Sequence, residues 1–105
     1  MTIKPLQILA AVALVLAVAQ PAAADDQAKL ATDKGCTACH AVDKKVIGPA
    51  YKDVAKKYKS DAKAADTLAA KVVKGGSGVW GPIPMPPNKV SDDEAKKLVA
   101  WILSL

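Results

Sequence analysis

The stretch Lys34-Gly35-Cys36-Thr37-Ala38-Cys39-His40 decides how this chain folds. Its two cysteines are the only ones among the 105 residues, and its histidine is the only histidine. Two intervening residues let both sulfurs reach the two vinyl groups on one porphyrin edge, and the histidine that follows then lies beneath the iron. The motif therefore predicts one haem c, held covalently through Cys36 and Cys39, with His40 as an axial iron ligand.

Three other interpretations of this motif remain open at this point. A thioredoxin-like redox disulfide would accompany a βαβ unit, yet no segment after residue 24 alternates polar and apolar residues over a strand length. A zinc site needs about four protein ligands, and the chain supplies only two Cys and one His. A simple structural disulfide would make the adjacent histidine a coincidence. Haem attachment is the interpretation that uses all three side chains.

The sixth iron ligand is expected to be Met85, because the chain's other methionine is the initiator. Met85 lies in Pro82-Ile83-Pro84-Met85-Pro86-Pro87, where the prolines restrict the backbone and present a thioether at little entropic cost. Two alternatives are that Met85 fills a gap in the core and that a lysine binds the iron at high pH. A His/Met pair is typical of haem c in electron transfer, so these ligands predict an electron carrier and not an enzyme.

Hydrophobic periodicity predicts an all-α domain with about four short helices. They are expected from Asp25-Asp26 to Gly35, over residues 51–58, from an Asp61 cap to Gly75-Gly76, and from the capping box Ser91-Asp92-Asp93-Glu94 onward. The apolar stripes of the last two helices are expected at Ala65, Leu68, Ala69, Val72 and Val73, and at Ala95, Leu98, Val99, Ile102 and Leu103.

Residues 75–88 are predicted to form a long loop, because their prolines and glycines exclude a helix and a central strand. Loops of this length are usually functional or disordered. This one carries apolar side chains such as Trp80 and Ile83, so it is expected to pack against something rather than to move freely.

Residues 1–24 are expected to be a secretory signal peptide that is cleaved before Asp25, leaving a single domain over residues 25–105. Lys4 gives the positive start, residues 8–19 form an apolar run, and residues 22–24 are three alanines. The alternative is an uncleaved membrane anchor, since the uncharged stretch 5–24 is long enough to span a bilayer. Haem c is attached outside the cytoplasm, which fits export and predicts a periplasmic protein without stable membrane insertion.

The chain has 15 lysines, no arginine and a net charge of +5. A basic surface can attract acidic proteins, anionic membranes or nucleic acid. Nucleic acid is excluded by the lack of arginine, the lack of aromatic residues among the basic ones, and the predicted export. There is no Phe and there are only two Trp and two Tyr. So small a core usually needs a cofactor, a metal, disulfides or oligomerisation for stability.

With these residues in place, the chain resembles the small class I bacterial cytochromes c of the c-551/c-552 type. The resemblance covers nearly all of residues 25–105 and is carried by residues 34–40, 46–55 and 75–88. It implies the class I cytochrome c fold, with short helices wrapped around one haem.

The resemblance also implies roles around the haem. Pro49 resembles the residue whose carbonyl accepts a hydrogen bond from the His40 ring, Trp80 one whose indole reaches a haem propionate, and Asn88 one that bonds near the methionine sulfur. Lys71 stands where many relatives carry an arginine near a propionate, and a lysine lacks the bidentate fork of arginine.

By the same resemblance, the chain is expected to be a monomeric shuttle between respiratory redox proteins. The partners implied are a quinol-oxidising complex on one side and a nitrite reductase or terminal oxidase on the other, met through transient docking assisted by lysines. Two rival functions remain at this point. One is an enzyme or gas sensor with an open haem position, and the other is an accessory subunit of a larger oxidoreductase.

Overall fold

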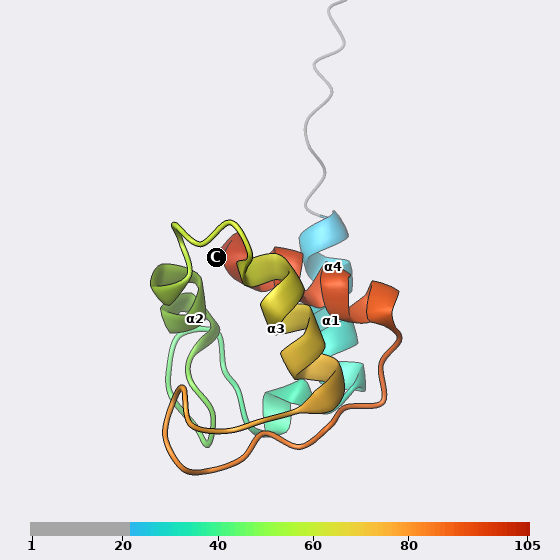
Figure 1. The fold of residues 1–105 in the computed structure, drawn as a ribbon. Helices are drawn as coiled ribbons and strands as arrows, with labels where there is room; N and C mark the ends of the chain where they lie inside the picture. The colour runs from blue at the N-terminus through green and yellow to red at the C-terminus, as the bar shows by residue number, and fades with distance from the viewer. Residues whose placement is uncertain (1–21) are drawn as a thin grey trace, which may run out of the picture.

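The computed structural model describes residues 22–105, which form four α-helices and one short 3-10 turn (Figure 1). In chain order these are α1 (Ala22–Asp33), η1 (Cys36–Ala38), α2 (Tyr51–Lys57), α3 (Ala64–Lys74) and α4 (Asp92–Leu103). The described residues contain no strand, and only two isolated bridges join His40 to Lys45 and Gly76 to Met85. The predicted all-α fold with four short helices is confirmed.

The predicted signal peptide lies outside the described residues, except for residues 22–24. These three alanines are the start of α1, which therefore begins earlier than the expected Asp25-Asp26. Alanine has the highest helix propensity, so the helix extends backward through them. None of the helices within residues 22–105 combines the length and the hydropathy needed to cross a membrane.

The C-terminal helix α4 is the centre of the fold, because it packs against α1, α2 and α3. Its start is the predicted capping box. The Ser91 side chain accepts a hydrogen bond from Glu94 N–H at 3.1 Å, and the Glu94 carboxylate accepts one from Ser91 N–H at 3.0 Å. A helix start leaves N–H groups without a helical partner, and a capping box gives two of these donors a side-chain acceptor. The cap therefore fixes where α4 begins and which face it turns inward.

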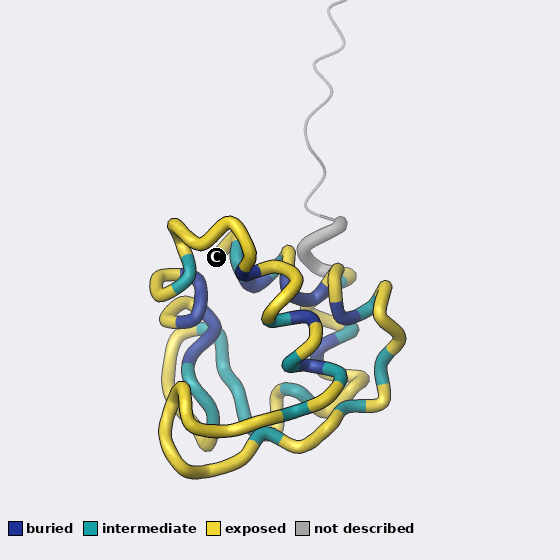
Figure 2. The backbone as a smooth tube through the Cα atoms, in the orientation of Figure 1, coloured by how far each residue is buried: buried dark blue, intermediate teal, exposed yellow. Residues whose placement is uncertain are grey.

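Two small clusters form the apolar core, one on each side of α4. The first lies between α3 and α4 and contains Ala69, Val72, Ala95 and Val99. The second lies between α2 and α4 and contains Tyr51, Val54 and Ile102. Figure 2 shows that the buried segments belong to the helices, whereas the long connection between α3 and α4 is largely exposed.

The start of α3 differs from its prediction. The helix begins at Ala64, and the Asp61 side chain accepts a hydrogen bond from Lys63 N–H at 2.8 Å instead of capping the helix. Asp61 thus stabilises the turn before α3, a local bond that aspartate forms readily. Since that turn draws the chain inward, Ala64 is buried and Ala65, expected in the core, is exposed.

Replacing Ser91 with alanine should lower the free energy of unfolding by about 1 kcal/mol, because it removes the side-chain oxygen that accepts from Glu94 N–H. Ser91→Asp, which keeps a capping oxygen, should retain most of the stability. Urea unfolding of the haem-loaded protein measures both variants. Equal losses for alanine and aspartate would contradict a capping role.

Candidate functional site

A cavity of about 360 Å³ lies between α2, α3, α4 and the loop that connects α3 to α4. Volumes of this size are typical of small-molecule and cofactor sites. Its walls include Cys39, His40 and Met85, three of the residues singled out by the sequence. Its remaining lining is mostly apolar, with Val54, Leu68, Val72, Val99 and Ile102 from the three helices.

The cysteine motif enters the cavity through a tight turn. Gly35 has φ of +80°, a left-handed conformation that glycine adopts without strain, and it turns the chain out of α1. The Cys36 carbonyl then accepts hydrogen bonds from the N–H groups of Cys39 at 3.2 Å and His40 at 3.0 Å. These two bonds curl the motif so that Cys39 and His40 face the cavity together.

The His40 ring is held in one tautomer by Pro49. Nδ1 lies 2.8 Å from the Pro49 carbonyl oxygen. Because a carbonyl can only accept, Nδ1 carries the proton, and Nε2 keeps its lone pair for another partner. This contact is the one that the family resemblance implied for Pro49.

Gly48 provides the space for the imidazole. A Cβ placed on Gly48 would lie 2.8 Å from Nδ1 and 2.9 Å from Nε2 of His40, which is closer than real contacts of this kind. Gly48 was not among the residues predicted for the haem environment. The dipeptide Gly48-Pro49 predicts a turn, but nothing in it shows that the ring of His40 packs on that turn.

Tyr51 is a second residue that was not among those predicted for the haem environment. It is buried, and its ring stacks on that of His40 with the ring centroids 5.0 Å apart. It also makes a T-shaped contact with Trp101, with the ring centroids 5.7 Å apart. Burial raises the pKa of the Tyr51 hydroxyl well above its ordinary value, so the group stays neutral. Tyr51 therefore fixes the imidazole from a side that Pro49 does not reach.

The structure does not favour the other interpretations of the cysteine motif. Both cysteines are free thiols. Burial is the main cause that raises the pKa of the Cys36 thiol, whereas redox-active cysteines depend on a lowered pKa. Within residues 22–105 no group of three or more Cys, His, Asp or Glu side chains is arranged to hold a metal ion, which leaves zinc without a site.

The long loop carries Met85 to the cavity and is tied to the end of α3. Gly76 N–H donates to the Met85 carbonyl at 3.0 Å, and Met85 N–H donates to the Gly76 carbonyl at 2.8 Å. A Cβ on Gly75 would lie 3.0 Å from Pro86 C and Pro87 N. The two glycines thus let the two arms of the loop approach backbone to backbone, and Met85 packs against the α3–α4 cluster.

Asn88 closes the same loop at its far end. Its side-chain amide donates to the Val72 carbonyl at 2.9 Å and to the Pro86 carbonyl at 3.3 Å. Within residues 22–105, the Asn88 side-chain amide therefore donates to backbone carbonyls and not to the sulfur of Met85. Val72 belongs to the last turn and a half of α3, where carbonyls lack helical partners, so Asn88 joins the loop to the helix end.

Lys71 and Trp80 also lie on the cavity wall. Lys71 is half-buried, and its side chain runs over Gly76, where a Cβ would meet Nζ at 2.5 Å and Cδ at 3.1 Å. Trp80 is 43% exposed, and the Lys57 ammonium lies over its ring, 5.5 Å from the ring centroid. The structure thus brings the predicted haem residues to one cavity or to the loop that closes it, except Cys36, which lies in the turn three residues before the cavity-lining Cys39.

The donor set fits a haem c. The Cys39 thiol, an imidazole with Nε2 available and a single thioether line one apolar cavity, and the Cys36 thiol lies in the tight turn that leads into it. Thioethers and an aromatic nitrogen are the donors that haem c uses, and the apolar walls suit a porphyrin face.

Comparison with known proteins agrees with this chemistry. Residues 24–105 match the Cytochrome c family. The chain is 54% identical over 101 residues to cytochrome c-551 of Pseudomonas aeruginosa, covering 96% of this chain and 97% of that protein. It is 60% identical over 77 residues to cytochrome c-552 of Hydrogenobacter thermophilus, covering 73% of this chain and 79% of that protein.

Solved structures show the same relationship. The crystal structure of wild-type Nitrosomonas europaea cytochrome c552 superposes with a TM-score of 0.72 at 57% identity, covering 74% of this chain and 98% of that one. A class 1 cytochrome of Sideroxydans lithotrophicus is more distant, at 38% identity and a TM-score of 0.64. The chain belongs to the cytochrome c family, and with its c-551 and c-552 relatives it is a carrier of single electrons with one covalent haem c.

Proposed function

We propose that this chain shuttles electrons between respiratory proteins in the periplasm, with Cys36 and Cys39 as the haem thioethers and His40 and Met85 as the axial iron ligands. The observation that carries the proposal is that His40 and Met85, 45 positions apart in the sequence, line one apolar cavity next to Cys39. The chain has no other histidine, and its only other methionine is the initiator.

The role of His40 follows from its hydrogen bond. Nδ1–H donates to the Pro49 carbonyl at 2.8 Å, so Nε2 is the ring nitrogen whose lone pair would bind the iron. Such a bond fixes the ring orientation and raises the basicity of the ligating nitrogen. Gly48 and the stacked Tyr51 ring keep the imidazole from turning.

The role of Met85 follows from how the loop holds it. Its backbone is paired on both sides with Gly76, so the side chain alone is free to meet the iron. A thioether is a neutral, soft donor and favours the reduced metal. The bound haem supplies the one-electron Fe(II)/Fe(III) couple. A haem bound by both His40 and Met85 would leave no ligand position for a substrate, which suits a carrier.

The remaining cavity residues complete the proposed site. Lys71 and Trp80 are assigned to the haem propionates, since each brings an N–H group to the cavity wall. Asn88 is assigned to the Met85 loop, which it bonds through the Val72 and Pro86 carbonyls. The effect of Asn88 on the methionine is then exerted through the loop backbone.

The partners proposed are a quinol-oxidising complex as donor and a nitrite reductase or terminal oxidase as acceptor, each bound transiently by a monomer. Without Lys4, residues 25–105 carry 14 lysines and 10 acidic residues, and this formal net charge of +4 and the exposed lysines support docking to acidic surfaces. Transient contact suits a shuttle, because a carrier has to leave one partner before it reaches the next.

Met85→Ala should remove the weak far-red absorption band that the oxidised wild type shows with a thioether ligand. The reduced variant should bind carbon monoxide at neutral pH, because an axial position is now open, whereas the wild type should not. Ile83→Ala, a truncation in the same loop at an exposed residue, is the control and should keep the band. A wild type that lacks the band, or that binds carbon monoxide readily, would favour an open-site enzyme or sensor.

Gly48→Ala should destabilise the haem-loaded protein by about 1–3 kcal/mol, because the added methyl overlaps the His40 ring. The ring should move away from Pro49, which shifts the His40 ring resonances in the NMR spectrum of the reduced protein. Val46→Ala, a truncation two residues earlier in the same turn, should leave those resonances in place. An unshifted His40 in Gly48→Ala would contradict the positioning role of Gly48.

Export and cleavage have a direct readout. The intact mass of protein recovered from the periplasm should equal residues 25–105 plus one haem. A mass that includes Met1 would contradict cleavage and support the membrane-anchor alternative.

A further inference from the structure

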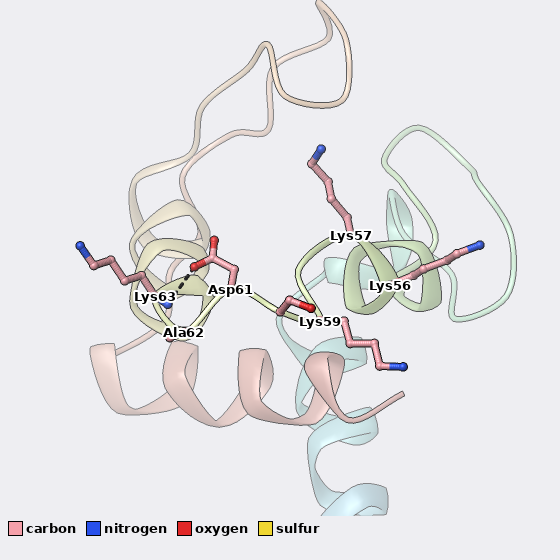
Figure 3. Close-up of a pocket in the computed structure, with 7 residues that line it drawn as sticks. Lys56, Lys57, Lys59, Asp61, Ala62 and Lys63 are labelled. Atoms are coloured by element: carbon pink, nitrogen blue, oxygen red, sulfur yellow. Dashed lines mark hydrogen bonds between the residues drawn. The ribbon is translucent and has the colours of Figure 1, made fainter.

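Four lysines surround a shallow hollow at the end of α2 and the turn that follows it. The hollow is lined by Lys56, Lys57, Lys59 and Lys63, which we call the α2 patch, together with Ser60, Asp61 and Ala62 (Figure 3). The four patch residues are all exposed. They are the densest group of lysines in the chain, with four ammonium groups within eight residues.

The positive charge of the α2 patch is not neutralised within the described residues. The ion pairs found there use Lys29, Lys34 and Lys52, and none joins a patch lysine to a carboxylate. Asp61 is the one acid in the hollow, and its Oδ1 accepts from the Lys63 backbone N–H. The patch therefore keeps a net positive field toward solvent.

The α2 patch borders the cofactor cavity. The Lys57 ammonium lies 5.5 Å from the Trp80 ring centroid and 5.9 Å from that of Tyr58, and both aromatic residues line the cavity. A positive charge over an aromatic face is a favourable contact. Lys57 thus connects the charged surface with an exposed part of the cavity rim, so a molecule docked on the patch would lie beside the haem site.

Three of the ten acidic residues lie together in another part of the molecule. Asp92, Asp93 and Glu94 form the first turn of α4, which lies across the molecule from α2 in Figure 1. This separation gives the molecule a positive α2 side and a negative α4 start. Such an asymmetric field orients a charged partner during approach and raises its association rate.

The geometry of the patch favours a broad partner over a small anion. In Figure 3 the side chains of Lys56, Lys57, Lys59 and Lys63 spread away from one another instead of converging on one point. Diverging ammonium groups do not enclose a single phosphate in a tight site. Their summed field still attracts any polyanion, and they can meet several carboxylates on an extended surface.

We propose that the α2 patch is the docking surface for an acidic redox-partner protein, and that the partner seats over the Trp80 rim of the haem cavity. The proposal rests on the electron-shuttle function above and assigns it a face. The competing face is the rim near Lys44 and Lys45, on the Cys39 side of the cavity, where Lys45 is part of the lining.

Three pairs of adjacent lysines allow a matched test. Lys56 and Lys57 belong to the patch, Lys44 and Lys45 to the competing rim, and Lys96 and Lys97 to the exposed side of α4. Each pair is replaced with glutamates. The three variants therefore have the same net charge and differ only in the part of the surface whose charge is reversed. The measured quantity is the second-order rate at which hexacyanoferrate(III), a small trianion, takes one electron from the reduced haem protein and becomes hexacyanoferrate(II).

K56E/K57E should slow this oxidation about tenfold at low ionic strength and flatten its dependence on salt, while K96E/K97E should slow it less than about twofold. Because Lys56 and Lys57 are in the last turn of α2, their reversal weakens a favourable helix-dipole contact. K59E/K63E makes the same charge change outside α2 and should give the same slowing. Equal slowing by all three adjacent pairs, or the largest slowing in K44E/K45E, would overturn the proposal.

A second readout does not depend on electron transfer. Hexacyanochromate(III), a redox-inert paramagnetic anion, should broaden the amide NMR signals of residues 56–63 more than those of residues 92–97. Poly-L-glutamate, as an acidic polypeptide, should bind the wild type and lose most of its affinity for K56E/K57E. Patch-dependent binding to phosphatidylglycerol vesicles without binding to poly-L-glutamate would replace the protein partner with a membrane surface.

The two proposals fail in different ways. A wild type that hexacyanoferrate(III) cannot oxidise reversibly would contradict the shuttle function itself. A wild type that is oxidised reversibly, with no difference among the three lysine pairs, would leave the shuttle function standing and remove only the assignment of its docking face.

Discussion

Twelve hydrophobic residues are buried in the described part of this chain, and half of them are alanines. Among these residues only Leu98 and Val99 are both large and fully enclosed. Two small clusters on either side of α4 cannot fill the space between α2, α3 and the long loop, and a cavity of about 360 Å³ remains there. The apolar faces of a haem supply the missing contacts in that space. The need for the cofactor as a core element is therefore the constraint on which the rest of the structure depends.

In the proposed site, contacts with the rest of the protein hold both candidate ligands in place. The Pro49 carbonyl, Gly48 and Tyr51 hold His40 from three sides. The Met85 backbone is paired with Gly76, and Asn88 bonds the same loop to Val72 at the end of α3. Ligands that are already positioned change little between the two oxidation states, and small reorganisation suits a protein that passes single electrons.

Local signals in the sequence predicted well where the chemistry is local. The capping box of α4 involves residues three positions apart, and both of its hydrogen bonds are present. The prediction was less accurate where neighbours compete. Asp61 stabilises a turn instead of capping α3, and that turn buries Ala64 in place of Ala65. α1 also begins earlier than expected. Three alanines precede the expected cap, and their high helix propensity extends the helix backward.

The sequence by itself determined the cofactor and its candidate ligands. Cys36, Cys39 and His40 lie in one short motif, and Met85 is the only methionine besides the initiator. Only the tertiary structure decided what surrounds them. Gly48 and Tyr51 act on His40 from another segment, and the Asn88 amide reaches Val72 across 16 positions. The tertiary structure also places the Lys57 ammonium over the Trp80 ring, and this contact connects a lysine surface with the cavity rim. Contacts between distant segments depend on how helices pack, and no spacing in a single sequence encodes that packing.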